Sequence, residues 1–171
     1  NLDDLDLNPL LVQADPGENP RFCKDKLINK VPDTLDEKIW LDIKEQVDEK
    51  EKKYFEYEIK NTSRSVGTRL SHYVYKKFGN NKLDKDSITI KLNGSAGQSL
   101  GAFLSKGIKL VVEGDTNDYV GKGLSGGTII VYPPLKSKLI SEKNIIIGNT
   151  VLYGATAGKL YASGQAGERF A

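Results

Sequence analysis

Three residues with hard oxygen ligands, Asp115, Asn117 and Asp118, lie close together and suggest calcium chemistry. An EF-hand would extend such a series to a glutamate at the end of its loop. A calcium-binding β-helix repeat would return an aspartate on every turn. Neither pattern follows here, so the favoured interpretation is a capped Asx turn, with a calcium site as the alternative.

The run from Gly121 to Gly126 matches G-x-G-x-x-G, the glycine pattern of a dinucleotide-binding turn. That turn needs a buried strand before it and a helix after it, because the helix N-terminus faces the pyrophosphate. Residues 128–131 instead predict a strand directly after the glycines. Corners of a tightly coiled chain therefore explain the glycines better than a nucleotide site does.

Nucleophiles and metal ligands are scarce, since Cys23 and His72 are the only cysteine and the only histidine. The sequence places no base beside Cys23 and no carboxylate four residues from His72. Glu168 and Arg169 stand in a glycine-rich corner, where we expect a structural salt bridge or a contact with a neighbouring domain. We therefore predict no catalytic, cofactor-binding or metal-binding residue in this chain.

Composition excludes several classes of partner. The 171 residues carry a net charge of +2 and 38% apolar residues, a balance typical of a soluble protein. There is no basic stripe with interleaved aromatic residues, so nucleic acid is not an expected partner. No apolar run approaches the roughly 20 residues that cross a bilayer, so no membrane is expected either. Because the chain begins at Asn1, lacks methionine and stops within a repeat at Ala171, we expect a piece of a longer protein, truncated at its C-terminal end.

Three regions position these residues. Residues 1–33 predict an extended connector, with turn chemistry in the Asp-Pro-Gly-Glu-Asn-Pro run at 15–20. Residues 34–79 predict a helical segment, and residues 80–171 a repeat domain that begins with a polar turn over 80–86.

The helical segment contains two helices and a short strand. Thr34 and Glu37 fit a capping box, and an apolar stripe at every fourth residue predicts a helix that runs to about Lys52. Alternation over 55–59 predicts the strand. Ser63 is the expected N-cap of a second helix, which Gly79 ends.

The repeat domain shows a period of 20 residues. The run 88–94 alternates apolar and polar residues up to a glycine, and 108–114 repeats it. Strands are predicted at 87–92, 108–113, 128–132, 144–147 and 159–162, with Pro133-Pro134 opening an outward excursion. Such a period favours a parallel β-helix, in which each turn buries its apolar edge on its neighbours. The alternative is an antiparallel sandwich or barrel with a hairpin turn at Asn93-Gly94.

Several long motifs give a resemblance to a known family. They are the runs 94–103 (GSAGQSLGAF), 113–127 (EGDTNDYVGKGLSGG), 148–150 (GNT) with 152–156 (LYGAT), and 164–171 (GQAGERFA). Upstream, 15–21 (DPGENPR) and 61–70 (NTSRSVGTRL) also match. Together they resemble the C-terminal glycine-rich (GXGXG-motif) domain of the glutamate synthase large (alpha) subunit. The same fold resembles a formylmethanofuran dehydrogenase subunit, but the upstream helical region favours glutamate synthase.

The resemblance implies a fold and a role. It implies a mainly β fold, a right-handed parallel β-helix preceded by an extended connector and two α-helices. The family is an oxidoreductase that makes glutamate from glutamine and 2-oxoglutarate, using ammonia released by an amidotransferase domain. Its synthase domain holds FMN and an iron–sulfur cluster and takes electrons from NAD(P)H or ferredoxin.

In that family the glycine-rich domain carries none of these groups. We therefore expect a structural domain that is inactive alone, with the amidotransferase and synthase domains of its own chain as partners. A small electron-transfer subunit or domain is a further expected partner, and the expected location is intracellular, in cytoplasm or plastid. The alternatives from other classes are a stand-alone β-helix enzyme and a calcium- or glycan-binding module.

Overall fold

The computed structural model describes residues 5–11, 15–20, 22–23, 28, 30, 32–47, 51–79 and 83–171. The chain forms two compact units, Asn1–Pro32 and Asp33–Ala171. The first unit contains a short 3-10 helix, Asn8–Leu10. The turn predicted at 15–20 is confirmed, because the Gly17 N–H donates to Asp15 Oδ1 at 2.9 Å. No helix among the described residues is long and apolar enough to cross a membrane.

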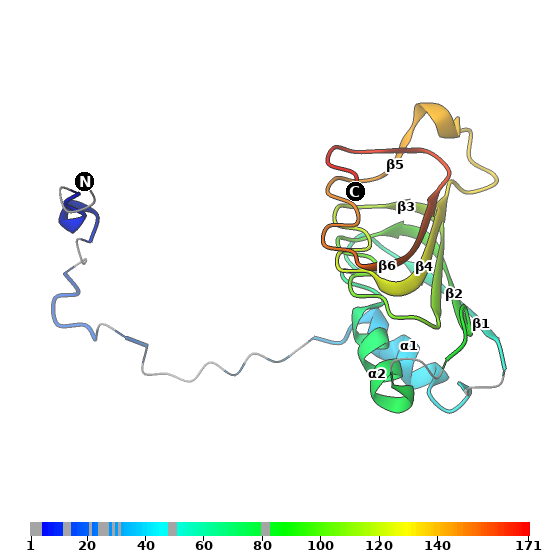
Figure 1. Cartoon of the computed structure of the whole chain (residues 1–171), viewed down its shortest axis with the longest axis horizontal. Coiled ribbons are helices and arrows are strands. Elements are labelled where there is room, and N and C mark those ends of the chain that lie inside the picture. The colour runs from blue at the N-terminus through cyan, green and yellow to red at the C-terminus, as the bar shows by residue number, and fades with distance from the viewer. Residues whose placement is uncertain are drawn as a thin grey trace. The chain divides into compact units, whose positions relative to one another are not determined.

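The second unit is a mixed α/β structure built on a parallel sheet of seven strands (Figure 1). The strands are β1 (Lys53–Ile59), β2 (Ile88–Ala96), β3 (Ile108–Thr116), β4 (Ser125–Tyr132), β5 (Ile145–Ile147), β6 (Ala157–Ala162) and β7 (Gln165–Ala166). Their order is β1-β2-β3-β4-β6, and β5 pairs with β3 and β7. The predicted strands are confirmed, but β7 was not predicted. The antiparallel alternative is wrong, because Asn93 and Gly94 lie within β2 and continue its parallel pairing with β3.

The 20-residue period is confirmed by the strand register. Ile88 pairs with Ile108, Ile90 with Leu110 and Leu92 with Val112 along β2 and β3. All six side chains are fully buried. One face of each strand thus supplies the core, and burial of each such side chain contributes about 1.5–3 kcal/mol.

Two helices, α1 (Leu35–Ile43) and α2 (Thr68–Phe78), lie beside each other at the β1 end of the sheet (Figure 1). The Thr34 cap is confirmed, because its Oγ1 accepts the Glu37 N–H at 3.2 Å. Gly79 ends α2 as predicted, with φ 74°. Buried residues of both helices join the same core as the strands.

Two helix boundaries were predicted wrongly. The first helix ends at Ile43 and not near Lys52, because the chain turns there and the Gln46 N–H donates to the Ile43 carbonyl at 2.8 Å. Val47 stays buried after that turn, while 48–50 lie outside the described residues. The second helix begins at Thr68 after an N-cap at Gly67, so Ser63 is not its cap.

The chain between the helical segment and the repeats does not separate two cores. β1 belongs to the predicted segment 34–79, yet it pairs with β2 over its whole length. The predicted division at residue 80 therefore falls between two neighbouring strands of one sheet. Of the polar turn predicted at 80–86, residues 80–82 lie outside the described residues, and the Ser87 N–H closes the rest on the Asp84 carbonyl at 3.4 Å.

The outward excursion after Pro133-Pro134 is confirmed. Residues 134–140 are mainly exposed, and the Leu135 side chain is 87% exposed. Figure 1 shows this segment standing away from the sheet before the chain returns through a 3-10 helix, Ser141–Lys143, to β5.

Candidate functional site

The glycine motif forms stacked connections, which we call the corner ribbon: residues 99–103, 119–123 and 150–154. In each connection every second residue has a positive φ of 55–68°: Ser99, Gly101, Phe103, Tyr119, Gly121, Gly123, Thr150, Leu152 and Gly154. Figure 1 shows these segments as waves stacked on the side of the unit away from β1 and β2. The G-x-G spacing is thus part of a conformational pattern that recurs in all three connections.

Hydrogen bonds of the corner ribbon run alternately to the preceding and the following turn. The Gly121 N–H donates back to the Leu100 carbonyl at 2.9 Å. The N–H groups of Tyr119 and Gly123 donate forward, to the carbonyls of Asn149 at 2.9 Å and Tyr153 at 2.8 Å. Each connection is therefore tied to both neighbours, in the way that the strands are tied on the sheet side.

This geometry decides between the two interpretations of the run Gly121–Gly126. β4 begins at Ser125, so the strand predicted after the glycines is confirmed. The helix N-terminus that a dinucleotide site requires has no counterpart at this position. The amide groups of Gly121 and Gly123 already bond to carbonyls of adjacent turns. The glycines that match G-x-G-x-x-G are therefore explained by the stacking of the connections and not by a dinucleotide site.

Close packing fixes at least one of these glycines. A Cβ on Gly101 would lie 2.4 Å from Ile129 Cδ1, in a backbone with φ +65°. Ile129 is fully buried, so its side chain has little room to move. Gly154 has nearly the same backbone, φ +68°, but open space where its Cβ would be. Gly101 is thus required both by its left-handed backbone and by the lack of space for a Cβ, whereas Gly154 is required by its backbone alone.

The residues that suggested calcium are used to join turns. Asp118 Oδ1 accepts the Asn149 N–H at 2.7 Å, and Asn149 Oδ1 accepts the Glu168 N–H at 2.7 Å. Asn117 Oδ1 accepts the adjacent Asp118 N–H at 2.7 Å, which is not the predicted Asx turn to the second residue on. Asp115 accepts the Ser95 hydroxyl from the neighbouring strand. Across the part of the chain that the structure describes, no group of three or more His, Cys, Asp or Glu could hold a metal.

The other candidate residues are not brought together. Cys23 is exposed and belongs to the first unit. His72 is exposed on α2, where its ring packs against Tyr73 with centroids 5.6 Å apart. Glu168 and Arg169 are exposed, and neither side chain forms an ion pair with another described residue. The expected salt bridge is therefore not found within the described chain.

A buried carboxylate was missed by the sequence interpretation. Asp36 is 3% exposed, and its oxygens accept the N–H groups of Gly67 at 2.6 Å and Arg69 at 2.8 Å. It therefore caps α2 from the first turn of α1, where the sequence pattern shows only one helical acid among several. Burial raises the pKa of Asp36, although these amides and that of Leu70 act to lower it.

An ionic ladder crosses the outer face of the sheet. Lys91 Nζ on β2 lies 3.2 Å from Glu56 Oε1 on β1 and 2.9 Å from Glu113 Oε2 on β3. A hydrogen bond from Asn93 and then one from Lys91 lower the pKa of Glu56. The Lys91 hydrogen bond likewise lowers the pKa of Glu113, and the two carboxylates raise that of Lys91. Groups held in their charged forms in this way stabilise the sheet and are poor proton-transfer groups near neutral pH.

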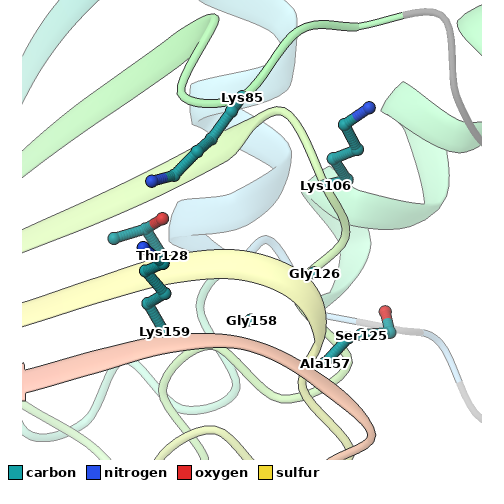
Figure 2. A pocket seen from close by; sticks show the side chains of 8 residues that line it. All are labelled: Lys85, Lys106, Ser125, Gly126, Thr128, Ala157, Gly158 and Lys159. Atoms are coloured by element: carbon teal, nitrogen blue, oxygen red, sulfur yellow. The ribbon is translucent and has the colours of Figure 1, made fainter.

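A cavity of about 550 Å³ opens where the strands begin. It is lined by Lys85, Lys106, Ser125, Gly126, Thr128, Ala157, Gly158 and Lys159 (Figure 2). Figure 2 shows the ends of Lys85 and Lys159 directed toward Thr128, whereas Lys106 points away. Thr128 and Lys159 are partners in the pairing of β4 with β6. Because these lysines are far apart in sequence, only the sheet order reveals the site.

Comparisons with known proteins agree with the resemblance. The family model described as "GXGXG motif" matches residues 36–171. The whole chain is 62% identical to part of the glutamate synthase [NADPH] large chain of Azospirillum brasilense, of which it covers 11%. Over 97% of the chain it is 46% identical to glutamate synthase [NADH] of Saccharomyces cerevisiae, covering 8% of that protein.

A third relative depends on another electron donor. Over 98% of the chain it is 44% identical to ferredoxin-dependent glutamate synthase 2 of Synechocystis sp., of which it covers 11%. The chain thus spans only about a tenth of the length of the curated relatives it matches. It belongs to the GXGXG-motif family and is similar, along its whole length, to one region of glutamate synthase large chains.

Proposed function

We propose that this chain is a non-catalytic structural domain of a glutamate synthase, which braces the glutamine amidotransferase and FMN-dependent synthase domains. The parent enzyme would make glutamate from glutamine and 2-oxoglutarate inside the cell, in cytoplasm or plastid. The observation that carries the proposal is the stacking of turns on both sides. The strands pair in parallel, β2 and β3 with a 20-residue offset, while the corner ribbon joins neighbouring connections on the other side of the core. Several charged groups reinforce this framework, because Asp118 bonds to the Asn149 N–H and Lys91 links Glu56 to Glu113.

We infer from the same observation that the domain is a right-handed parallel β-helix. A coil is the arrangement in which both the strand and its connection meet the same neighbouring turns. Parallel strands joined by crossover connections are right-handed in almost all proteins. A coil of this kind is stiff, since each inner turn is hydrogen-bonded to the turns on both sides of it, and stiffness suits a part that holds other domains in place.

The cofactors of the parent enzyme would lie outside this chain. The names of the relatives point to NADPH, NADH or ferredoxin as electron donors, and the family implies FMN and an iron–sulfur cluster. A cluster takes several cysteine thiolates as ligands, whereas this chain has Cys23 alone, so its residues do not fit a cluster.

Activity assays on the purified 171-residue chain test the proposal. We expect no glutamine hydrolysis, no glutamate formation and no flavin absorbance after purification from cells. As a positive control, a complete glutamate synthase is assayed in the same buffers. Turnover of glutamine by the chain alone would overturn the proposal.

A further inference from the structure

The lysines of the cavity differ from the other lysines on the outer face of the sheet. Lys91 is paired with Glu56 and Glu113, and Lys109 Nζ lies 3.4 Å from Asp86 Oδ2. Lys85, Lys106 and Lys159 have no ion-pair partner among the described residues. The described residues that line the cavity include these three lysines and no acidic side chain.

The carboxylate bonded to Thr128 already has two partners. Asp86 Oδ1 accepts the Thr128 hydroxyl at 2.8 Å, and its other oxygen faces Lys109. Asp86 forms an ion pair with Lys109 and none with Lys85 or Lys159, whose ends gather on either side of Thr128 (Figure 2). Two unpaired ammonium groups directed at one point repel each other, and an anion between them would convert that repulsion into attraction.

The cavity has room for such an anion. Its volume of about 550 Å³ falls in the range of small-molecule sites. Part of its lining is Gly126, Ala157 and Gly158, which contribute little or no side chain. Packing explains the glycine at 158, since a Cβ there would lie 2.6 Å from the Gly127 carbonyl oxygen. These small residues therefore make room for a ligand, but they supply no side chain that would select one ligand over another.

We propose that this cavity binds a small, doubly charged oxyanion, held by Lys85 and Lys159. The Thr128 hydroxyl donates to Asp86, so recognition depends on ammonium charge and not on a fixed fork of donors. That chemistry accepts a phosphate or a dicarboxylate. Lys106 points away and contributes only through its charge (Figure 2). The site is independent of the bracing role, because a rigid domain without it would brace equally well.

The test is a titration of the 171-residue chain with inorganic phosphate and, separately, with succinate. Amide NMR shifts of Gly126, Thr128, Gly158 and Lys159 are followed at constant ionic strength, set with sodium chloride. We expect saturating shifts confined to this cavity, and the tighter of the two anions identifies the ligand class. A general effect of salt would shift amides near exposed lysines throughout the chain, so binding at the site requires that the shifts be confined to the cavity.

Substitutions distinguish a specific binding site from non-specific attraction of anions to surface lysines. Lys85→Gln and Lys159→Gln should each weaken binding about tenfold, the effect of losing one charge-assisted contact. Lys136→Gln removes an equally exposed lysine from the excursion after β4 and should leave binding unchanged. Shifts that never saturate with either anion, or equal weakening by Lys136→Gln, would overturn the proposal.

Discussion

Substitution of Gly101 by alanine tests the stacked arrangement most sharply in a single position. Two costs add at this site. A left-handed backbone costs a residue with a Cβ about 1 kcal/mol. The new methyl group would also lie 2.4 Å from Ile129 Cδ1 and 3.2 Å from Ile129 Cγ1, and overpacking of a filled core costs about 1–3 kcal/mol. We expect Gly101→Ala to lower the free energy of unfolding by about 3 kcal/mol.

Gly154→Ala is the matched control, because its backbone is left-handed and its Cβ would meet no atom within 4 Å. It should cost only the conformational part, about 1 kcal/mol. Ile129→Val supplies the second control by deleting Cδ1, the atom in closest conflict. On its own that change costs about 0.5–1.5 kcal/mol. In its presence, Gly101→Ala should cost about 1–2 kcal/mol less than in the unmodified chain.

Urea unfolding of the unmodified chain and the four variants gives these free-energy differences from the midpoints, provided that the denaturant dependence stays constant. Two results would refute the reasoning. Equal costs for Gly101→Ala and Gly154→Ala would mean that Ile129 does not lie against this corner. Strict additivity in the double variant would mean that the two side chains do not meet, and therefore that the ribbon does not pack on β4 as described.

Two further predictions concern buried and paired charges. Asp36→Ala leaves the N–H groups of Gly67 and Arg69 without their acceptor. It should lower the free energy of unfolding by about 3 kcal/mol, which corresponds to about 6–12 °C in Tm. Asp33→Ala, which changes an exposed neighbour, should leave the Tm nearly unchanged. A Tm for Asp36→Ala within 2 °C of the unmodified chain, on the order of a surface substitution, would contradict the capping role. For the ladder, the pKa values of Glu56 and Glu113 are lowered from 4.5, so their stabilisation is present above that value and is lost as the pH falls through the folded-state pKa values. Lys91→Met should therefore reduce the difference between urea midpoints at pH 7 and pH 3, while Lys136→Met should not; an unchanged difference in Lys91→Met would refute the assignment.

Much of the sheet was predictable because its pattern is local. Alternation over 88–94 and its return at 108–114 predicted two strands, and their 20-residue offset is the observed register. The Thr34 cap was predictable for the same reason, since its partner Glu37 lies three residues on. What the periodicity could not show is the order of the later strands, where β5 pairs with β3 and β6 with β4.

The failures have non-local causes. α2 begins at Thr68 because Asp36, from a distant part of the sequence, accepts its first amides, so the local cap at Ser63 was not needed. The lysine cavity joins residues from 85 to 159 through the sheet order alone. The glycine run 121–126 is not one of these failures, because the strand predicted after it already favoured corners over a dinucleotide-binding turn, and the positive φ values at alternate residues agree.

The central claim, that this domain contributes no group to the reaction, is tested by one rate measurement. The variant combines Cys23→Ser, His72→Gln, Asp115→Asn and Glu168→Gln within a complete glutamate synthase that carries this segment, so that exposed groups capable of proton transfer or nucleophilic attack are removed together. We predict a kcat for glutamate formation within about twofold of the unmodified enzyme, since the proposed function assigns the general acid–base and nucleophilic groups to other parts of the enzyme. A fall in kcat of about a hundredfold or more, with flavin content and Tm unchanged, would contradict the account.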